Sequence, residues 1–204
     1  AAVAAAADAA AEHAIMATRA RLLADPSVDT LRSELAQARS VAASRVKDAA
    51  PLSVKALGQL YGGALAALKL RELASASGLA SLAFGAVKFE GNTALGHTNQ
   101  AQAAIVMLAT EIAIAQDQQA QALNLLKAYV PTQSPSLPAS TPFARSALLL
   151  WAQASRAPGA AAHALPQAVE QLQTWVALQP QDALAWDALA SAYTAQNQRL
   201  RVHY

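Results

Sequence analysis

Four residues near the end of the chain have a spacing that strongly constrains the fold. Residues spaced i, i+3, i+4 and i+7 share one face of an α-helix, and this spacing relates Trp186, Leu189, Ala190 and Tyr193. The small side chain of Ala190 would let a partner helix approach closely. We therefore predict that these residues form the buried face of a helix that packs in a helical hairpin.

The same spacing occurs earlier in the chain, between residues 105 and 112. Its members are Ile105, Leu108, Ala109 and Ile112. A polar turn at 116–119 follows, and a second apolar segment, 122–129, leads to Pro131. Hairpins that recur without a strict period are typical of a divergent repeat array.

The composition favours helices throughout the 204 residues. Ala dominates, Leu and Gln are abundant, and aromatic residues make up only 5% of the chain. These are helix-forming residues, whereas strand-forming side chains are scarce. We expect an all-α protein in which antiparallel helical hairpins stack as a divergent solenoid.

Breaks in the hydrophobic pattern divide the chain into four parts. We expect an N-terminal helical hairpin at residues 1–50 and further hairpins at 51–130. A loop rich in Pro, Ser and Thr is expected at 131–142. Residues 143–204 should form a C-terminal hairpin and the start of another repeat. The chain begins without Met and ends within a helical pattern. We therefore expect it to be part of a larger protein.

Local signals refine this organisation. Asp25 is expected to cap the second helix with Pro26 in its first position, and Asp182 is expected to cap the last helix. Gly62 and Gly63 lie inside a helical pattern, where each costs about 1 kcal/mol relative to Ala. We interpret this pair as the place where another helix backbone packs closely.

Two sets of residues follow from the hairpin model. The apolar side chains that we expect in the repeat core are Tyr61, Ile105, Leu108, Ile112, Trp175, Trp186, Leu189, Ala190 and Tyr193. Polar side chains on the first helices of hairpins are candidates for a binding groove, and they are Asn99, Gln102, Gln116, Asp187 and Gln196.

Several classes of function lack their sequence signatures. The Lys and Arg residues are scattered and the net charge is only +2, which argues against nucleic-acid binding. No stretch is long and apolar enough for a transmembrane helix. The chain has no Cys, its His residues are far apart, and it contains neither His-Glu-x-x-His nor Gly-x-Ser-x-Gly. We predict no catalytic, metal-binding or cofactor-binding residues, and expect binding to proteins or peptides instead.

The order of several segments resembles a known family. These segments are residues 13–21, 23–28, 60–66 and 172–186, the last beginning Leu172-Gln173-Thr174-Trp175-Val176. Together with the Trp186 to Tyr193 spacing, they resemble the C-terminal tetratricopeptide repeat (TPR) region of BepA-like periplasmic zinc metallopeptidases. The resemblance spreads over most of the chain.

The resemblance implies a role in envelope protein quality control. The parent protein would be an exported zinc metalloendopeptidase whose zinc and water-activating Glu lie in a catalytic domain outside this chain. The present chain would be its noncatalytic TPR-like domain in the periplasm, which recognises outer-membrane proteins, their assembly machinery or its own protease domain. No catalytic residue of that family has a matching position here.

Two other hypotheses remain open at this point. The chain could be a freestanding TPR adaptor with no protease attached, either in the cytoplasm or in the periplasm. A His-Glu-x-x-His motif upstream in the same reading frame would separate this alternative from the first. An enzymatic role for the chain itself predicts metal-dependent peptide cleavage by the isolated protein, for which the sequence offers no motif.

Overall fold

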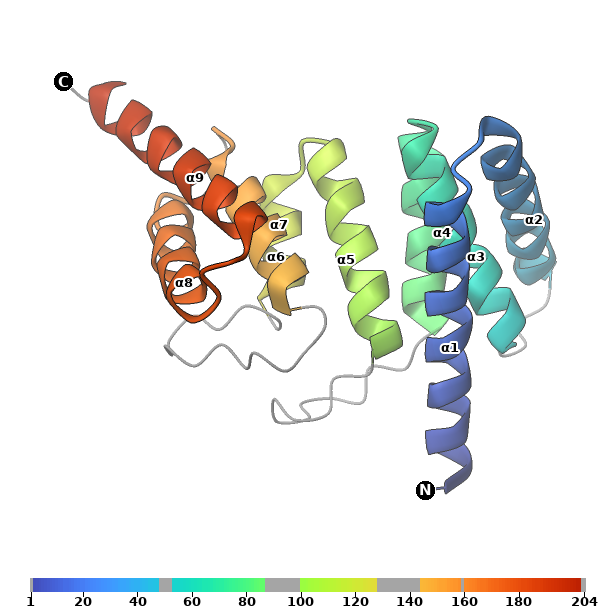
Figure 1. Ribbon diagram of the computed structural model, residues 1–204. Helices are drawn as coiled ribbons and strands as arrows, with labels where there is room; N and C mark the ends of the chain where they lie inside the picture. Colours follow the sequence, from blue (N-terminus) through green and yellow to red (C-terminus); the bar gives the residue numbers. More distant parts are fainter. Residues whose placement is uncertain (1, 48–52, 87–99, 128–143, 159, 203–204) are drawn as a thin grey trace. The chain divides into compact units, whose positions relative to one another are not determined.

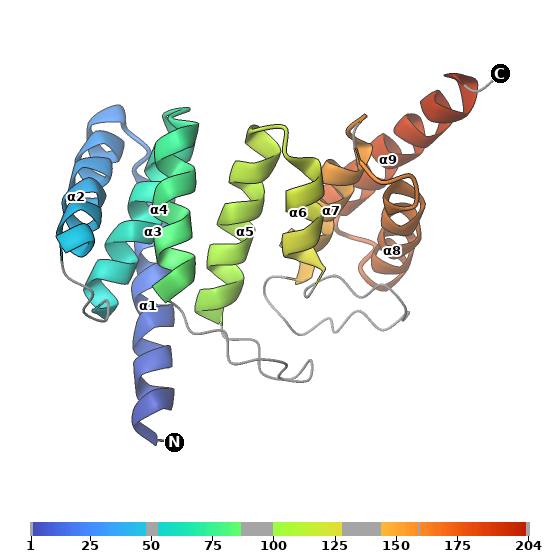
Figure 2. The same ribbon diagram turned by 180° about the vertical axis from the view of Figure 1, so that it is seen from behind.

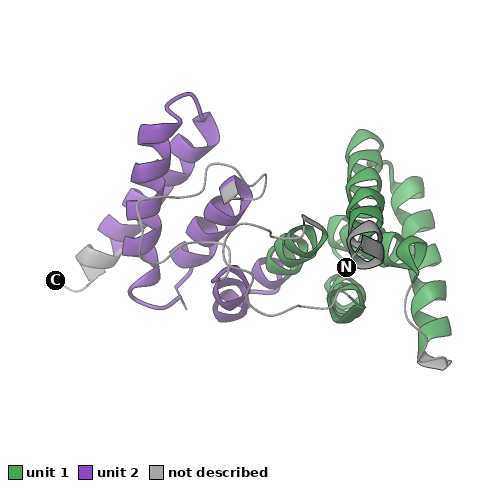
Figure 3. Cartoon of the chain, turned by 90° about the horizontal axis from the view of Figure 1, so that it is seen from below, with its two compact units in different colours: residues 1–112 green, residues 113–204 purple. Residues whose placement is uncertain are grey.

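The computed structural model describes residues 2–47, 53–86, 100–127, 144–158 and 160–202. All regular structure in these residues is α-helical, as the two opposite views in Figures 1 and 2 show. The all-α prediction is therefore confirmed. The chain divides into two compact units, unit 1 (residues 1–112) and unit 2 (residues 113–204), which Figure 3 distinguishes by colour.

The described helices follow one another in chain order, and the helix that contains the expected apolar segment after the 116–119 turn begins at residue 119 and ends at residue 126 rather than 129. Their bounds are α1 (Ala2–Ala24), α2 (Val28–Lys47), α3 (Val54–Lys69), α4 (Leu73–Ala86), α5 (Gln100–Ala115), α6 (Gln119–Leu126), α7 (Ala144–Arg156), α8 (Ala164–Leu178) and α9 (Ala183–Val202). Among these described helices, none combines the length and the hydropathy that crossing a lipid bilayer requires. The predicted loop at 131–142 lies outside the described residues.

The start of α2 differs from the prediction. Ser27 caps this helix, because its hydroxyl accepts a hydrogen bond from the Thr30 amide at 3.4 Å and its carbonyl accepts one from the Leu31 amide at 3.0 Å. Asp25 instead accepts from the Ser27 amide and from the Thr30 hydroxyl, at 3.2 and 2.7 Å. Asp25 therefore holds the α1–α2 turn closed, and Pro26 precedes the helix; their predicted positions were wrong.

Helix α3 is the centre of unit 1 and packs against α1, α2 and α4. A Cβ atom at Gly62 would lie 2.5 Å from Oε1 of Glu34 and 2.7 Å from Cγ2 of Thr18, and one at Gly63 would overlap Cβ of Ala38. Only glycine leaves room for α1 and α2 at this distance from α3. The interpretation of the glycine pair as a close-packing point is confirmed.

An ion pair between a buried carboxylate and a half-exposed guanidinium joins α1 to α2 beside this contact. Glu34 is only 4% exposed, and its Oε2 accepts a hydrogen bond from Nη2 of Arg21 at 2.6 Å. A buried carboxylate is costly unless it is paired. Arg21 therefore supports the close approach of α2 to the glycine pair by neutralising Glu34.

In unit 2, α7 packs against α6, α8 and α9, and α9 also packs against α8. The three helices α7, α8 and α9 meet at Asp182. Its Oδ2 accepts a hydrogen bond from Nε of Arg145 and its Oδ1 accepts one from Nη2 of Arg145, both at 2.6 Å. Oδ2 also accepts a hydrogen bond from Nε1 of Trp175 at 3.0 Å. Oδ1 further accepts from the Ala185 amide at 3.2 Å. Asp182 is thus the predicted helix cap and also a link between helices.

This network predicts an acid-sensitive unit 2. The hydrogen bonds from Arg145 hold the pKa of Asp182 well below its ordinary value of 3.8. A carboxyl group whose pKa is lower in the folded than in the unfolded state stabilises the fold. This stabilisation is complete at pH values above the pKa of the group in the unfolded chain, and it is lost as the pH falls through the acidic range. We expect Asp182→Asn to reduce the free energy of unfolding at neutral pH by about 1–3 kcal/mol, and the difference from wild type to shrink below about pH 4.

Urea denaturation followed by tryptophan fluorescence at several pH values would measure this effect, because Trp151, Trp175 and Trp186 all belong to unit 2. Asp187→Asn, at an exposed position on the same helix, is the matched control and should cost little. An Asp182→Asn effect that does not change with pH would contradict the role of the charge.

The buried face of α9 is not the one that the sequence spacing predicts. Trp186 is 46% exposed, Tyr193 is 40% exposed and Ala190 is exposed, so their assignment to a buried core was wrong. Among the α9 side chains that the structure describes, those of Ala185, Leu189 and Ala192 are buried. The other residues assigned to the core are buried, and they are Tyr61, Ile105, Leu108, Ile112, Trp175 and Leu189.

The physical reason lies in the packing of α9 on α7 and α8. Its two buried alanines, Ala185 and Ala192, let it pack closely on this side. The large aromatic residues lie outside this contact and are held by polar groups: Nε1 of Trp186 donates to the Pro180 carbonyl at 2.9 Å, and Gln173 donates to the Tyr193 hydroxyl. Both rings are thus ordered without being buried.

Candidate functional site

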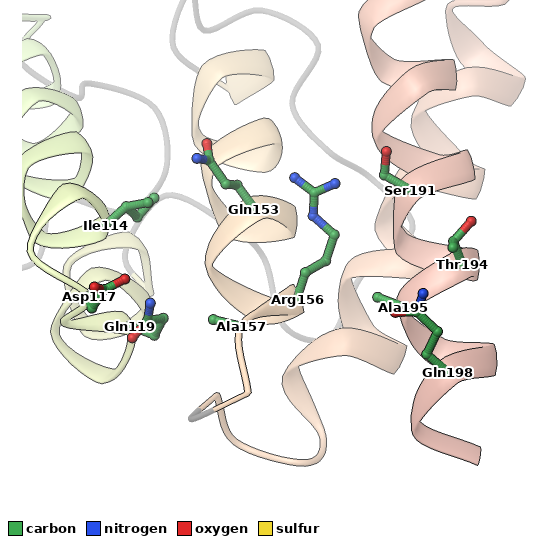
Figure 4. A pocket seen from close by; sticks show the side chains of 10 residues that line it. All are labelled: Ile114, Asp117, Gln119, Gln153, Arg156, Ala157, Ser191, Thr194, Ala195 and Gln198. Carbon is green, nitrogen blue, oxygen red and sulfur yellow. The ribbon is translucent and has the colours of Figure 1, made fainter. Parts of the chain in front are cut away.

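An open groove of about 580 Å³ crosses unit 2 (Figure 4). This volume is within the range of about 300–1,000 Å³ that is usual for binding sites. The groove is lined by residues from the end of α5, the α5–α6 turn, the start of α6, the C-terminal end of α7 and the residue after it, and α9. These residues are Ile114, Asp117, Gln119, Gln153, Arg156, Ala157, Ser191, Thr194, Ala195 and Gln198.

Helical spacing explains why these residues face the same groove. Gln153 and Arg156 of α7 and Ala157, which directly follows the helix, are spaced i, i+3 and i+4, while the buried Trp151 and Ala154 of α7 face the core. In α9, the lining residues at 191, 194, 195 and 198 form a similar stripe. The burial of one side of each helix therefore leaves a stripe of small and polar residues on another.

The α5–α6 turn forms one edge of the groove. Asp117 adopts a left-handed backbone conformation with a φ of 59°, which Asp tolerates better than most residues. The Asp117 amide donates to the Ile114 carbonyl at 3.1 Å, and the Gln118 amide donates to the Ala113 carbonyl at 2.8 Å. This hydrogen-bonded turn ends α5 and places the exposed Asp117 at the groove edge.

The lining offers many hydrogen-bonding groups and few charges. Figure 4 shows the Arg156 side chain in the space between α7 and α9. Within the described residues, the Arg156 guanidinium forms no hydrogen bond or ion pair, and Asp117 is the one carboxylate in the lining. The Thr194 hydroxyl donates to the Ala190 carbonyl at 3.0 Å, so its oxygen can still accept a hydrogen bond.

None of the four candidate groove residues that the structure describes lines this groove. Gln116 precedes the edge residue Asp117, Asp187 lies exposed one turn before Ser191, and Gln196 is half-buried on another side of α9. Gln102 belongs to unit 1, and Asn99 lies outside the described residues. The stripe at 191, 194, 195 and 198 could have been found from its helical spacing, but its pairing with α7 could not.

The groove lining combines amide and hydroxyl side chains with one guanidinium group and one carboxylate. In the part of the chain that the structure describes, no group of three or more His, Asp or Glu side chains is arranged to hold a metal ion. Comparisons with protein-family models, with curated proteins and with solved structures give no match for this chain.

Proposed function

We propose that this chain is a noncatalytic, TPR-like interaction domain whose groove in unit 2 binds an extended segment of a partner protein. The observation that carries this proposal is the set of amide side chains in the groove, from Gln119, Gln153 and Gln198. A side-chain amide offers both a donor and an acceptor. Amides placed on three elements can therefore hydrogen-bond to the backbone of an extended peptide largely independently of its sequence.

The packing of unit 2 supports a TPR-like arrangement. Helices α7 and α8 form a hairpin, and α9 packs against both of them, as the first helix of a following hairpin would. The groove stripes belong to α7 and α9, which are the first helices in this scheme. Stacked helical hairpins commonly bind partners along the surface that such helices form.

The resemblance to BepA-like peptidases suggests which partners to test. Unfolded outer-membrane proteins expose extended backbone, which amides can bind. The guanidinium of Arg156 would add a charge-assisted hydrogen bond to a carboxylate of the partner. In this proposal the zinc-dependent cleavage belongs to another domain of the parent metallopeptidase, and the present chain supplies recognition.

Peptide selection tests the groove directly. Short peptides selected from a random display library against the whole chain should bind measurably in fluorescence anisotropy. We expect Arg156→Ala to weaken binding of peptides that contain a carboxylate by about tenfold, and Gln153→Ala and Gln198→Ala to weaken it to a lesser extent. Gln121→Ala, at an exposed position of α6 outside the groove, should leave the affinity unchanged.

Equal affinities for all four variants would show that the groove is not the binding site. If the groove variants do weaken binding, a photo-crosslinking residue at position 153, compared with one at position 121, would identify the natural partner in bacterial cells. Crosslinks to outer-membrane proteins or their assembly factors would support the role in envelope quality control. Crosslinks to cytoplasmic proteins alone would favour the freestanding adaptor.

A further inference from the structure

A second, smaller cavity lies in unit 1, separate from the groove of unit 2. Its volume is about 190 Å³, and residues from α1, α3 and α5 line it. Its apolar wall includes the buried side chains of Tyr61, Leu65 and Leu108. At about 30 Å³ for each molecule of liquid water, this space equals about six water molecules. The cavity therefore suits one small molecule and is too small for a peptide segment.

Two opposite charges face this cavity without forming an ion pair. Glu111 of α5 and Arg19 of α1 both line it. Among the described residues, Glu111 has no hydrogen bond and no ion-pair partner. Burial raises the pKa of Glu111, and the more distant charges of Arg19 and Lys69 only partly oppose this rise.

The other polar groups at the cavity are already accommodated. Lys69 is exposed to solvent, so its ammonium group needs no protein partner. The hydroxyl of Tyr61 lies near Arg19, whose charge opposes the rise that burial causes in the pKa of Tyr61. Glu111 is thus the group at this cavity that most lacks a partner, because a half-buried carboxylate is stabilised by a nearby cation or donor.

We propose that the unit 1 cavity binds a free α-amino acid with a branched aliphatic side chain. The ligand ammonium would pair with Glu111, the ligand carboxylate would pair with Arg19, and the aliphatic side chain would pack on Leu65 and Leu108. A simple carboxylic acid would leave Glu111 unpaired, and a simple amine would bring a second cation toward Arg19. A zwitterion with an apolar body is the ligand class that meets all three requirements.

A set of matched ligands tests this proposal on the full chain. We would titrate isotope-labelled protein with L-leucine, with 4-methylpentanoate, which lacks the ammonium group, and with 3-methylbutylamine, which lacks the carboxylate. L-leucine should shift the NMR signals of backbone amides around the cavity in α3 and α5. Each analogue should bind at least about tenfold more weakly than L-leucine, because each loses one charged contact.

Two variants that each remove one charge assign the contacts. Glu111→Gln should weaken L-leucine binding by about tenfold but leave 4-methylpentanoate binding unchanged. Arg19→Gln should weaken L-leucine binding but not 3-methylbutylamine binding, which should instead strengthen because the like charge is removed. Glu12→Gln and Arg32→Gln, at positions of unit 1 outside the cavity, are the matched controls.

Three outcomes would overturn the proposal. The first is that L-leucine does not shift the NMR signals around the cavity, and the second is that L-leucine and its analogues bind with equal affinity. The third is that Glu111→Gln weakens the binding of all three ligands equally while it retains the wild-type circular dichroism spectrum. The groove of unit 2 plays no part in this experiment. Failure here would therefore leave the peptide-binding proposal intact.

Discussion

Replacing Trp175 by Ala should destabilise unit 2 by about 3–5 kcal/mol, as is usual for deleting a buried Trp side chain. The indole is 7% exposed, and its Nε1 donates to Oδ2 of Asp182 at 3.0 Å. The substitution would leave a cavity beside α9 and would remove one donor from the carboxylate that joins α7, α8 and α9. Urea denaturation monitored by the fluorescence of Trp151 and Trp186 would measure the loss.

The matched control is Trp186→Ala. Trp186 is 46% exposed and hydrogen-bonds to the Pro180 carbonyl, so we expect this change to cost only about 1 kcal/mol or less. The same residue change at two positions of unit 2 thus separates a buried ring from an exposed one. A loss of about 3 kcal/mol or more at Trp186 would show that its ring is buried in solution and would restore the core assignment made from the sequence.

The two tryptophans also show how far helical spacing predicts this fold. Spacing identifies residues that share a face of α9, but it does not determine which face meets the neighbouring helices. Ala185, Leu189 and Ala192 also have helical spacing, and their small side chains permit close packing on α7 and α8. In a chain so rich in Ala, apolar residues occur on several faces, and the tightest packing is not where the largest side chains are.

Features that depend on local sequence were predicted well. The helices follow from helix-forming composition and from the turn residues between them, and Asp182 caps α9 as expected. The glycine pair was also interpreted correctly, because two glycines in an otherwise strong helical segment need a packing reason. The capping of α2 was missed, because Asp25 and Ser27 are both good caps and the choice depends on the geometry of the turn.

The two candidate sites depend on contacts that are distant in sequence. The groove brings together Gln119, Gln153 and Gln198 from three elements, and no local pattern predicts that meeting. The unit 1 cavity had one sequence signal that could have been used. Glu111 is the single charged residue in the apolar segment 100–115, and an isolated carboxylate in such a segment suggests a buried group with a special partner.

Gly63→Ala should destabilise unit 1 by about 2–3 kcal/mol, toward the upper end of what an extra methyl group costs in a packed core. Helix propensity alone would favour Ala at this position by about 1 kcal/mol. However, the added Cβ would overlap Cβ of Ala38 and lie 3.3 Å from Cδ1 of Leu79. Both overlapping Cβ atoms are attached directly to backbone and cannot rotate away, so α2 would have to move away from α3.

Circular dichroism during urea denaturation would follow this change, since unit 1 contains no Trp. Gly78→Ala is the matched control: no atom lies within 4 Å of its new Cβ, so helix propensity should make it stabilising by up to about 1 kcal/mol. Adding Ala38→Gly to Gly63→Ala should recover part of the loss, because it removes the overlapping methyl group. If the effects of the two substitutions on the free energy of unfolding were instead simply additive, the cost of Gly63→Ala would not come from the α2–α3 contact. The glycine pair would then need another explanation.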